Sequence, residues 1–207
     1  MRIGLDFDNT LADYDALFAA LAVEQGVLDA LPRGGKREVR DLVRATAGEL
    51  AWRRLQAHAY GPHMSGARIM AGADKFLTTC KKLGLEVCIV SHKSRRAADE
   101  SVTDDLREAA MDWMRAQGFF ARFGLSDTRV HFEDTREAKV RRIASLGCAA
   151  FVDDLEEVFL TPGFPSGVRR ILFDPAGHAR GPFETCSTWE EIADACLRDS
   201  GAYVSAH

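Results

Sequence analysis

Five short runs of apolar, largely β-branched residues recur along the chain, and they constrain its fold more than any other feature. Each ends at polar or turn-forming residues, and together they cover residues 2–7, 86–90, 129–132, 149–152 and 168–173. Runs of this length and composition predict β-strands. Amphipathic segments of helical length lie between or after most of them, at residues 72–83, 103–117, 135–146 and 188–197. This alternation predicts an α/β fold, with a parallel sheet covered by helices on both faces.

The interval between the first two predicted strands is too long for a single crossover helix. It holds three helical patterns, at roughly residues 14–25, 37–46 and 49–59, with breaks at residues 32–35 and at Gly61-Pro62. We therefore expect a core domain formed by residues 1–13 and 69–207. A small α-helical cap, residues 14–68, is expected as an insertion into it.

Composition limits the classes of partner. The chain has 207 residues, 46% of them hydrophobic and 28% charged, with a net charge of -4 and a pI near 5.9. Nucleic-acid and anionic-membrane surfaces need clustered Lys and Arg, so we expect neither partner and instead a small substrate, with a homodimer left open. The chain shows no signal-peptide pattern and no membrane-spanning stretch, which predicts a cytoplasmic protein. Its five cysteines are widely spaced in apolar segments, so we expect reduced packing residues.

Acidic residues follow two of the predicted strands. Asp6-Phe7-Asp8-Asn9-Thr10 lies at the carboxyl end of the first, and Asp153-Asp154 directly follows the run at 149–152. Open parallel sheets form their ligand crevice at this end of the strands, so the four carboxylates should converge. Converging carboxylates repel one another unless a cation lies among them, and an all-oxygen ligand set suits Mg²⁺. The predicted metal ligands are Asp6, Asp8, Asp153 and Asp154.

Further residues at this edge could bind a phosphoryl group. Ser91 ends its strand with a hydroxyl, and Lys139, in the first half of a predicted helix, offers a mobile positive charge. Lys93 is expected either on a second anionic group of the substrate or in solvent. Each residue alone could equally be a turn former or a solvated side chain, and only their order and placement together favour a site. The predicted phosphate-binding residues are Thr10, Ser91, His92, Lys93 and Lys139.

The order of these motifs resembles the haloacid dehalogenase superfamily, whose four motifs match Asp6-Phe7-Asp8-Asn9-Thr10, Ser91, Lys139 and Asp153-Asp154. The resemblance implies a Rossmann-like core, a Mg²⁺ cofactor, an aspartyl-phosphate intermediate and a cap between the first two motifs. It implies that Asp6 is the nucleophile and a metal ligand, and that Asp8 is the general acid/base and gives its backbone carbonyl to the metal. Ser91 and Lys139 would hold the phosphoryl group. Asp153 would ligate the metal directly, and Asp154 directly or through water.

The residue types support phosphoryl chemistry independently of the family. An alkoxide is a poor leaving group and needs a proton donor, which Asp8 can supply. The resemblance points the same way, because the dehalogenase branch of the superfamily usually lacks this second aspartate. Mg²⁺ and Lys139 can neutralise a phosphate enough for the Asp6 carboxylate to approach it. We therefore expect a Mg²⁺-dependent phosphatase that acts on a small phosphorylated metabolite, such as a sugar phosphate or a nucleotide.

Four other interpretations can be compared with this one. A phosphorelay receiver has its acidic pair first and its lysine last, the reverse of the order here. An EF-hand fails because Leu11 and Leu17 stand where Gly and Glu are needed, and residues 34–37 lack the first Gly and the Ser/Thr of a P-loop. A catalytically inactive module that binds a phospholigand stays as the alternative. In either case substrate selection would involve one or two of the cap residues Arg53, Arg54, His58, Tyr60 and His63.

Overall fold

The computed structural model describes residues 1–198, which form two compact units. The sheet unit consists of Met1–Leu11, Ile69–Lys93 and Gly118–His207, described as far as residue 198. The helical unit consists of Ala12–Arg68 and Ser94–Gln117. The second of these segments is a difference from the division expected from the sequence, which left residues 94–117 in the core.

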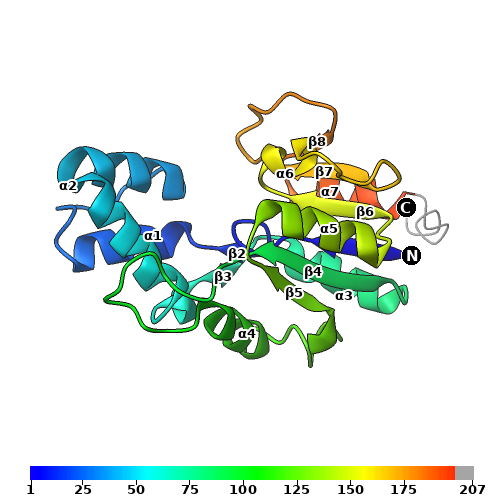
Figure 1. The fold of residues 1–207 in the computed structure, drawn as a ribbon, viewed down its shortest axis with the longest axis horizontal. Helices are drawn as coiled ribbons and strands as arrows, with labels where there is room; N and C mark the ends of the chain where they lie inside the picture. The colour runs from blue at the N-terminus through cyan, green and yellow to red at the C-terminus, as the bar shows by residue number, and fades with distance from the viewer. Residues whose placement is uncertain (199–207) are drawn as a thin grey trace. The chain divides into compact units, whose positions relative to one another are not determined.

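The sheet unit is built on six parallel strands in the order β5-β4-β1-β6-β7-β8. Figure 1 labels β4 to β8 of this sheet. The five runs predicted as strands form five of them, which confirms the predicted α/β parallel sheet. The sixth, β8, was not predicted. The strands are β1 Arg2–Leu5, β4 Glu86–His92, β5 Val130–Glu133, β6 Ala150–Asp153, β7 Arg169–Phe173 and β8 Glu184–Cys186.

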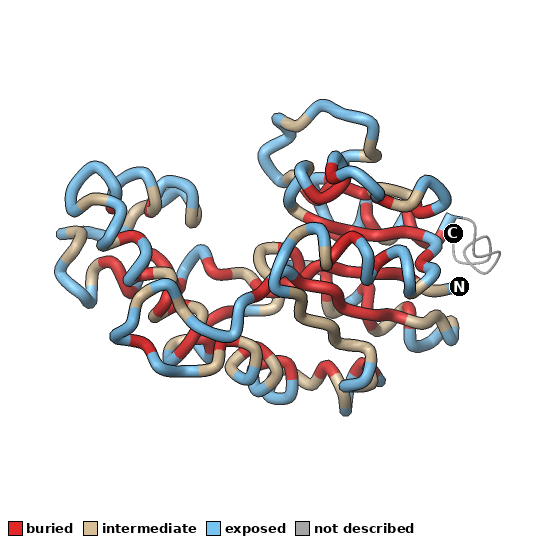
Figure 2. Tube along the Cα trace, in the orientation of Figure 1, coloured by how far each residue is buried: buried red, intermediate tan, exposed pale blue. Residues whose placement is uncertain are grey.

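Helices cover both faces of this sheet. On one face α3 (Ala73–Lys82) packs with α7 (Trp189–Leu197), and the rings of Phe76 and Trp189 lie 5.1 Å apart. On the other, α5 (Arg136–Leu146) and α6 (Glu156–Leu160) share a core cluster with Cys88 and Val90. Alternate residues of β4 serve both faces because successive side chains of a strand point in opposite directions. Figure 2 shows the consequence, with the central strands buried along most of their length. A 3-10 turn, η2 (Asp127–Arg129), precedes β5.

The helical unit contains α1 (Asp15–Glu24), α2 (Gly35–Tyr60) and α4 (Leu106–Ala116), with the 3-10 turn η1 (Met64–Gly66). Gly48 interrupts α2 with a φ of 83°, a left-handed conformation that glycine adopts at little cost, so α2 is two helical segments as the sequence pattern predicts. The core of the unit is aromatic: the rings of Phe18 and Trp52 stack 5.1 Å apart. The short strands β2 (Ala12–Asp13) and β3 (Arg68–Ile69) pair where the chain passes between the units.

Two interactions help explain why residues 94–117 belong to the helical unit. Trp113, on the buried face of α4, donates its indole N–H to the carbonyl of Ala67 at 2.9 Å. Arg54 forms an ion pair with Asp99, with 3.4 Å between Nε and Oδ2. The helical period of residues 103–117 correctly predicts an amphipathic helix, but an apolar face does not specify the element it packs against.

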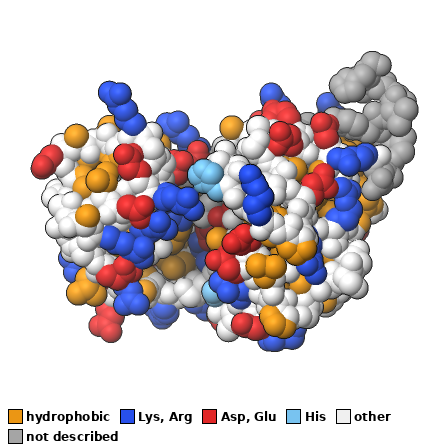
Figure 3. All heavy atoms as spheres, turned by 90° about the horizontal axis from the view of Figure 1, so that it is seen from above, with side chains coloured by type: hydrophobic (Ala, Val, Ile, Leu, Met, Phe, Trp, Pro, Cys, Tyr) orange, Lys and Arg blue, Asp and Glu red, His pale blue; other side chains and the backbone are white. Residues whose placement is uncertain are grey.

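The described surface carries charges of both signs. On the face that Figure 3 presents, Lys and Arg side chains are interspersed with Asp and Glu. Among residues 1–198, no helix is both long enough and apolar enough to cross a membrane. All five cysteines are free and buried, as expected for packing residues.

Candidate functional site

The predicted site residues of the sheet unit lie at the carboxyl ends of β1, β4 and β6. Leu5 of β1 pairs with Ile89 on one side and Val152 on the other, so the residues that follow these three strands share one edge. Asp6 continues the pattern, since its backbone N–H donates to Val152 O at 2.8 Å. The edge that the sequence predicted to be the ligand crevice therefore does bring Asp6, Ser91 and Asp153 to neighbouring strands.

Lys139 joins two of the carboxylates. Its Nζ lies 2.5 Å from Oδ1 of Asp6 and 2.7 Å from Oδ2 of Asp153. All three side chains are buried, with 2% or less of Lys139 and Asp153 exposed. Helix α5 sets this position: Thr135 caps it by accepting from the N–H of Ala138, and Lys139 follows within the first turn. Burying an ammonium between two carboxylates has a desolvation cost, which the attraction between the opposite charges offsets.

Asp154 completes a cluster of three carboxylates. Asp6, Asp153 and Asp154 each offer one oxygen, and these atoms all lie within 4.8 Å of one another. The backbone N–H of Leu155 donates to Oδ1 of Asp153 at 3.1 Å, which helps to orient that side chain. The donor set consists of oxygens alone, which is the chemistry that Mg²⁺ prefers. The Asp8 carboxylate, in contrast, is not one of the three.

Burial raises the pKa of two carboxylates in this cluster, and Lys139 opposes that effect. Burial raises the pKa of Asp6 to about 7, with Asp153 and Asp8 acting in the same direction and Lys139 opposing them. Burial also raises the pKa of Asp153, again against the attraction of Lys139. For Lys139, burial acts to lower the pKa, but Asp153 and Asp6 outweigh it and hold the pKa above its usual value. A cation bound among the carboxylates would favour their ionised forms, as Lys139 does.

The turn after β1 adds Asn9 and Thr10. Asn9 has a φ of 60°, in the left-handed region that Asn tolerates better than most residues, and its Nδ2 donates to Oδ2 of Asp154 at 3.3 Å. The hydroxyl of Thr10, fully buried, lies 3.5 Å from Oδ2 of Asp6. Asn9 was not among the predicted site residues, although its place directly after Asp8 in the first acidic motif was a signal that could have found it.

The three residues predicted at the end of β4 take different positions. Ser91 is buried on β4, opposite Phe132 of β5. His92 is exposed, and its Nε2 lies 3.0 Å from the carbonyl of Asp134. Lys93 is 4% exposed, and its Nζ lies 3.0 Å from both carboxylate oxygens of Asp8. The expectation of a solvated Lys93 is therefore wrong, because this side chain is buried against an acidic partner.

The candidate specificity residues lie in the helical unit. Arg54 is paired with Asp99, and the hydroxyl of Tyr60 accepts from Lys36 Nζ at 2.7 Å. The rings of His58 and His63 lie 5.7 Å apart. Arg53 is exposed on α2.

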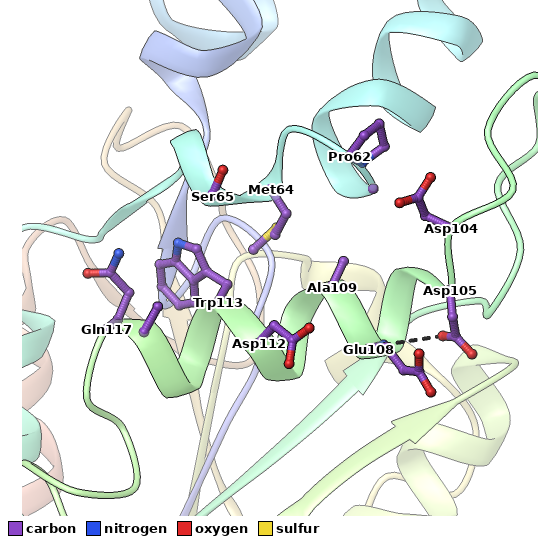
Figure 4. Close-up of a pocket in the computed structure, with 12 residues that line it drawn as sticks. Pro62, Met64, Ser65, Asp104, Asp105, Glu108, Ala109, Asp112, Trp113 and Gln117 are labelled. Atoms are coloured by element: carbon purple, nitrogen blue, oxygen red, sulfur yellow. Dashed lines mark hydrogen bonds between the residues drawn. The ribbon is translucent and has the colours of Figure 1, made fainter.

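The helical unit also contains a pocket of about 540 Å³, shown in Figure 4. Trp113 and Met64 contribute apolar surface to it, while the carboxylates of Asp104, Glu108 and Asp112 give it an acidic wall. Like charges repel, so this wall disfavours a phosphate. None of the sequence-predicted site residues lines this pocket. Its remaining lining residues are Gly61, Pro62, Ser65, Asp105, Ala109, Ala116 and Gln117.

The fold is shared with solved structures over almost the whole chain. A haloacid dehalogenase (HAD) family hydrolase from Deinococcus radiodurans R1, solved with bound phosphate and sodium, matches with a TM-score of 0.60 at 14% identity, covering 99% of this chain and 98% of that chain. A haloacid dehalogenase-like family hydrolase from Streptococcus pneumoniae matches with a TM-score of 0.57 at 12% identity, covering 94% and 97%. The chain has the haloacid dehalogenase fold. At the level of the fold, this agrees with the resemblance that the four motifs indicate.

Other comparisons show that the HAD fold does not specify an activity. No protein-family model matches the sequence, and no curated protein matches it significantly. Protein Tyrosine Kinase A (PtkA) from Mycobacterium tuberculosis also matches, with a TM-score of 0.55 at 13% identity over 94% of this chain and 97% of that chain. A fold that carries differently named activities does not by itself specify one, so function has to be argued from the site.

Proposed function

We propose that this protein is a Mg²⁺-dependent phosphomonoester hydrolase that uses Asp6 as its nucleophile. The observation that carries the proposal is the position of Asp6: its carboxylate follows the central strand β1, buried against Lys139 and grouped with Asp153 and Asp154. A carboxylate held in this way is preorganised, which is what nucleophilic attack on a phosphoryl group requires. The bound phosphate of the Deinococcus radiodurans structure agrees with this substrate class.

The carboxylate cluster fits a divalent cation. Three oxygens within 4.8 Å of one another match the small coordination sphere of Mg²⁺, which completes its shell with waters and substrate oxygens. Asp6, Asp153 and Asp154 would hold the ion, with the backbone carbonyl of Asp8 as a further ligand. When bound, Mg²⁺ neutralises charge on the phosphoryl oxygens and so lowers the barrier to attack by an anion.

In the first step, a carboxylate oxygen of Asp6 forms a bond to phosphorus as the bond to the leaving oxygen breaks. Lys139 engages Oδ1, so we assign the attack to Oδ2, whose contact with the Thr10 hydroxyl is a long 3.5 Å. Asp8 gives its proton to the departing alkoxide. Ser91, beside Asp6 at the sheet edge, offers its hydroxyl to a phosphoryl oxygen.

In the second step, water hydrolyses the aspartyl phosphate. Asp8, now ionised, removes a proton from a water molecule whose oxygen attacks phosphorus. The bond between phosphorus and Asp6 breaks, phosphate leaves, and the Asp6 carboxylate is restored. Asp8 regains its proton in the same step, so the cycle closes.

The proposed substrates are sugar phosphates, nucleotides or related metabolites, in that order of preference. We propose that polar side chains of the helical unit take part in leaving-group recognition. Binding energy from the leaving group can then select substrates while the sheet unit carries the chemistry.

An aryl phosphate assay tests the proposal. With Mg²⁺ the wild-type protein should release phenolate catalytically, and the variant Asp6→Asn should not, because a neutral amide is a poor nucleophile. The matched control is Asp127→Asn, which alters an exposed aspartate in η2. Phosphate binding by the wild type without any turnover of aryl or metabolite phosphates would instead support the inactive phospholigand module.

A further inference from the structure

Lys93 is a buried lysine next to the proposed acid/base. Only 3% of its side chain is exposed, and lysines are rarely buried to this degree without an anionic partner. Its partner is Asp8, whose two carboxylate oxygens each lie 3.0 Å from Nζ. One ammonium thus engages both oxygens of a side chain that is itself 20% exposed. The ion pair joins the end of β4 to the turn after β1.

Both the backbone and the side chain of Lys93 make contacts that hold the residue in place. Its backbone N–H donates to the carbonyl of Glu133 at 3.1 Å, which extends the pairing of β4 with β5 by one residue. Its Nζ lies 5.6 Å from the centre of the Phe7 ring, within the range of a cation-π interaction. Phe7 in turn packs edge-to-face against Phe132, 6.5 Å away. These contacts restrict the position of Lys93, so its ammonium can orient a neighbouring side chain.

We propose that Lys93 is the positioning residue of Asp8. This rests on the proposed function, in which Asp8 protonates the leaving group and later activates water. A strand-end carboxylate that is partly exposed can rotate about its side-chain torsions, whereas an ion pair to both oxygens restricts that rotation in the ionised form, which is the form that activates water. Misplacing a catalytic group by about 1 Å can cost about 10²-fold in rate. Lys93 acts through Asp8 and carries out no bond-making step itself.

The proposal differs from the sequence-based expectation that Lys93 binds the substrate, and kinetics can separate the two. An aryl phosphate does not need Asp8 in the first step, because phenolate leaves without a proton. The second step always needs Asp8 to activate water. A residue that acts only through Asp8 should therefore affect steady-state turnover but not the initial burst of phenolate. A residue that binds the phosphate should slow the burst and raise KM.

The experiment compares Lys93→Met, Asp8→Asn and the double variant under saturating Mg²⁺ and aryl phosphate. We expect Lys93→Met to keep the burst rate within about threefold of the wild type and to lower kcat about 10²-fold. In the Asp8→Asn background it should lower kcat by no more than about twofold further, since the two changes act on one group. Lys93→Arg should recover most of the activity, because a guanidinium can also engage both carboxylate oxygens.

Lys81→Met is the control, since it removes an exposed lysine of α3 whose Nζ bonds the carbonyl of Arg122. It should leave burst and kcat unchanged. If Lys93→Met does not fold, as judged by circular dichroism, Lys93→Gln takes its place in the same cycle. Losses that multiply in the double variant, or a slowed burst with raised KM, would overturn the positioning role while the phosphatase stands. An inactive wild type would overturn the proposed function, and the role of Lys93 with it.

Discussion

The Nζ of Lys139 lies 2.5 Å from Oδ1 of Asp6, and both side chains are almost completely removed from solvent. This ion pair connects the first turn of α5 to the end of the central strand β1. It holds the proposed nucleophile in one orientation and keeps a positive charge where a phosphoryl group would approach. The same lysine contacts Asp153, so a single side chain connects both acidic motifs.

Removal of this lysine should destabilise the protein as well as inactivate it. Lys139→Met leaves two buried carboxylates without their ammonium, and breaking a buried ion pair in this way costs about 3–5 kcal/mol. Urea denaturation in chelator measures the loss, and added Mg²⁺ should restore part of it by binding the folded state. Lys81→Met, on the surface of α3, should change the free energy of unfolding by no more than about 0.5 kcal/mol. An equal stability of wild type and Lys139→Met would contradict a stabilising role for this ion pair.

Activity should depend on Mg²⁺ and on Asp154. A chelator should abolish turnover, Mg²⁺ should restore it, and Ca²⁺ should restore it poorly because its longer bonds would displace Asp6 from phosphorus. Asp154→Asn should raise the Mg²⁺ concentration needed for half-maximal activity by about 10–100-fold. Asp127→Asn, in η2, should leave the Mg²⁺ requirement unchanged. Full turnover in chelator would contradict the assignment of the carboxylate cluster as a metal site.

Gly4 provides a test of the packing beneath the site. A Cβ added there would clash with Cδ2 of Phe151 and lie 3.1 Å from Sγ of Cys148, and both neighbours are buried in the core. Gly4→Ala should therefore lower the free energy of unfolding by about 1–3 kcal/mol. Gly167→Ala is the matched control, since a Cβ there meets nothing within 4 Å. Thermal melts of the two variants should differ clearly, and equal melting temperatures would show that β1 and β6 pack more loosely than described.

The sequence was sufficient to predict most of the sheet and to predict that Asp6, Asp153 and Asp154 meet at one of its edges. The apolar runs indicate the strands, and the acidic residues that follow them indicate the site. Both patterns lie within a few consecutive residues, so they can be recognised in the sequence. The strand β8 was missed because Glu184-Thr185-Cys186 is short and has no apolar run. The position of residues 94–117 was missed because helical periodicity does not specify the partner of a helix.

The contacts between side chains distant in sequence were also beyond local patterns. Lys93 and Asp8 are 85 positions apart, and they come together because β1 and β4 are adjacent strands of the sheet. Nothing in the residues around Lys93 distinguishes a buried ion pair from a substrate contact. For Asn9 the sequence does carry a local signal, because Asn adopts a left-handed φ more readily than most residues.

The central claim is that Asp6 forms the covalent intermediate and Asp8 resolves it. Asp8→Asn should release up to one equivalent of phenolate per enzyme from an aryl phosphate and then slow sharply, because the second step lacks its base. Asp6→Asn should give no burst. Mg²⁺ occupancy is measured for both variants, so that loss of metal is not mistaken for loss of chemistry.

Intact-mass spectrometry of Asp8→Asn, quenched after the burst, tests the claim most directly. The account predicts one added phosphoryl group per chain, located by peptide mapping at Asp6. Mapping of that group to any other residue would contradict the account, as would substantial turnover by a folded, metal-loaded Asp6→Asn variant.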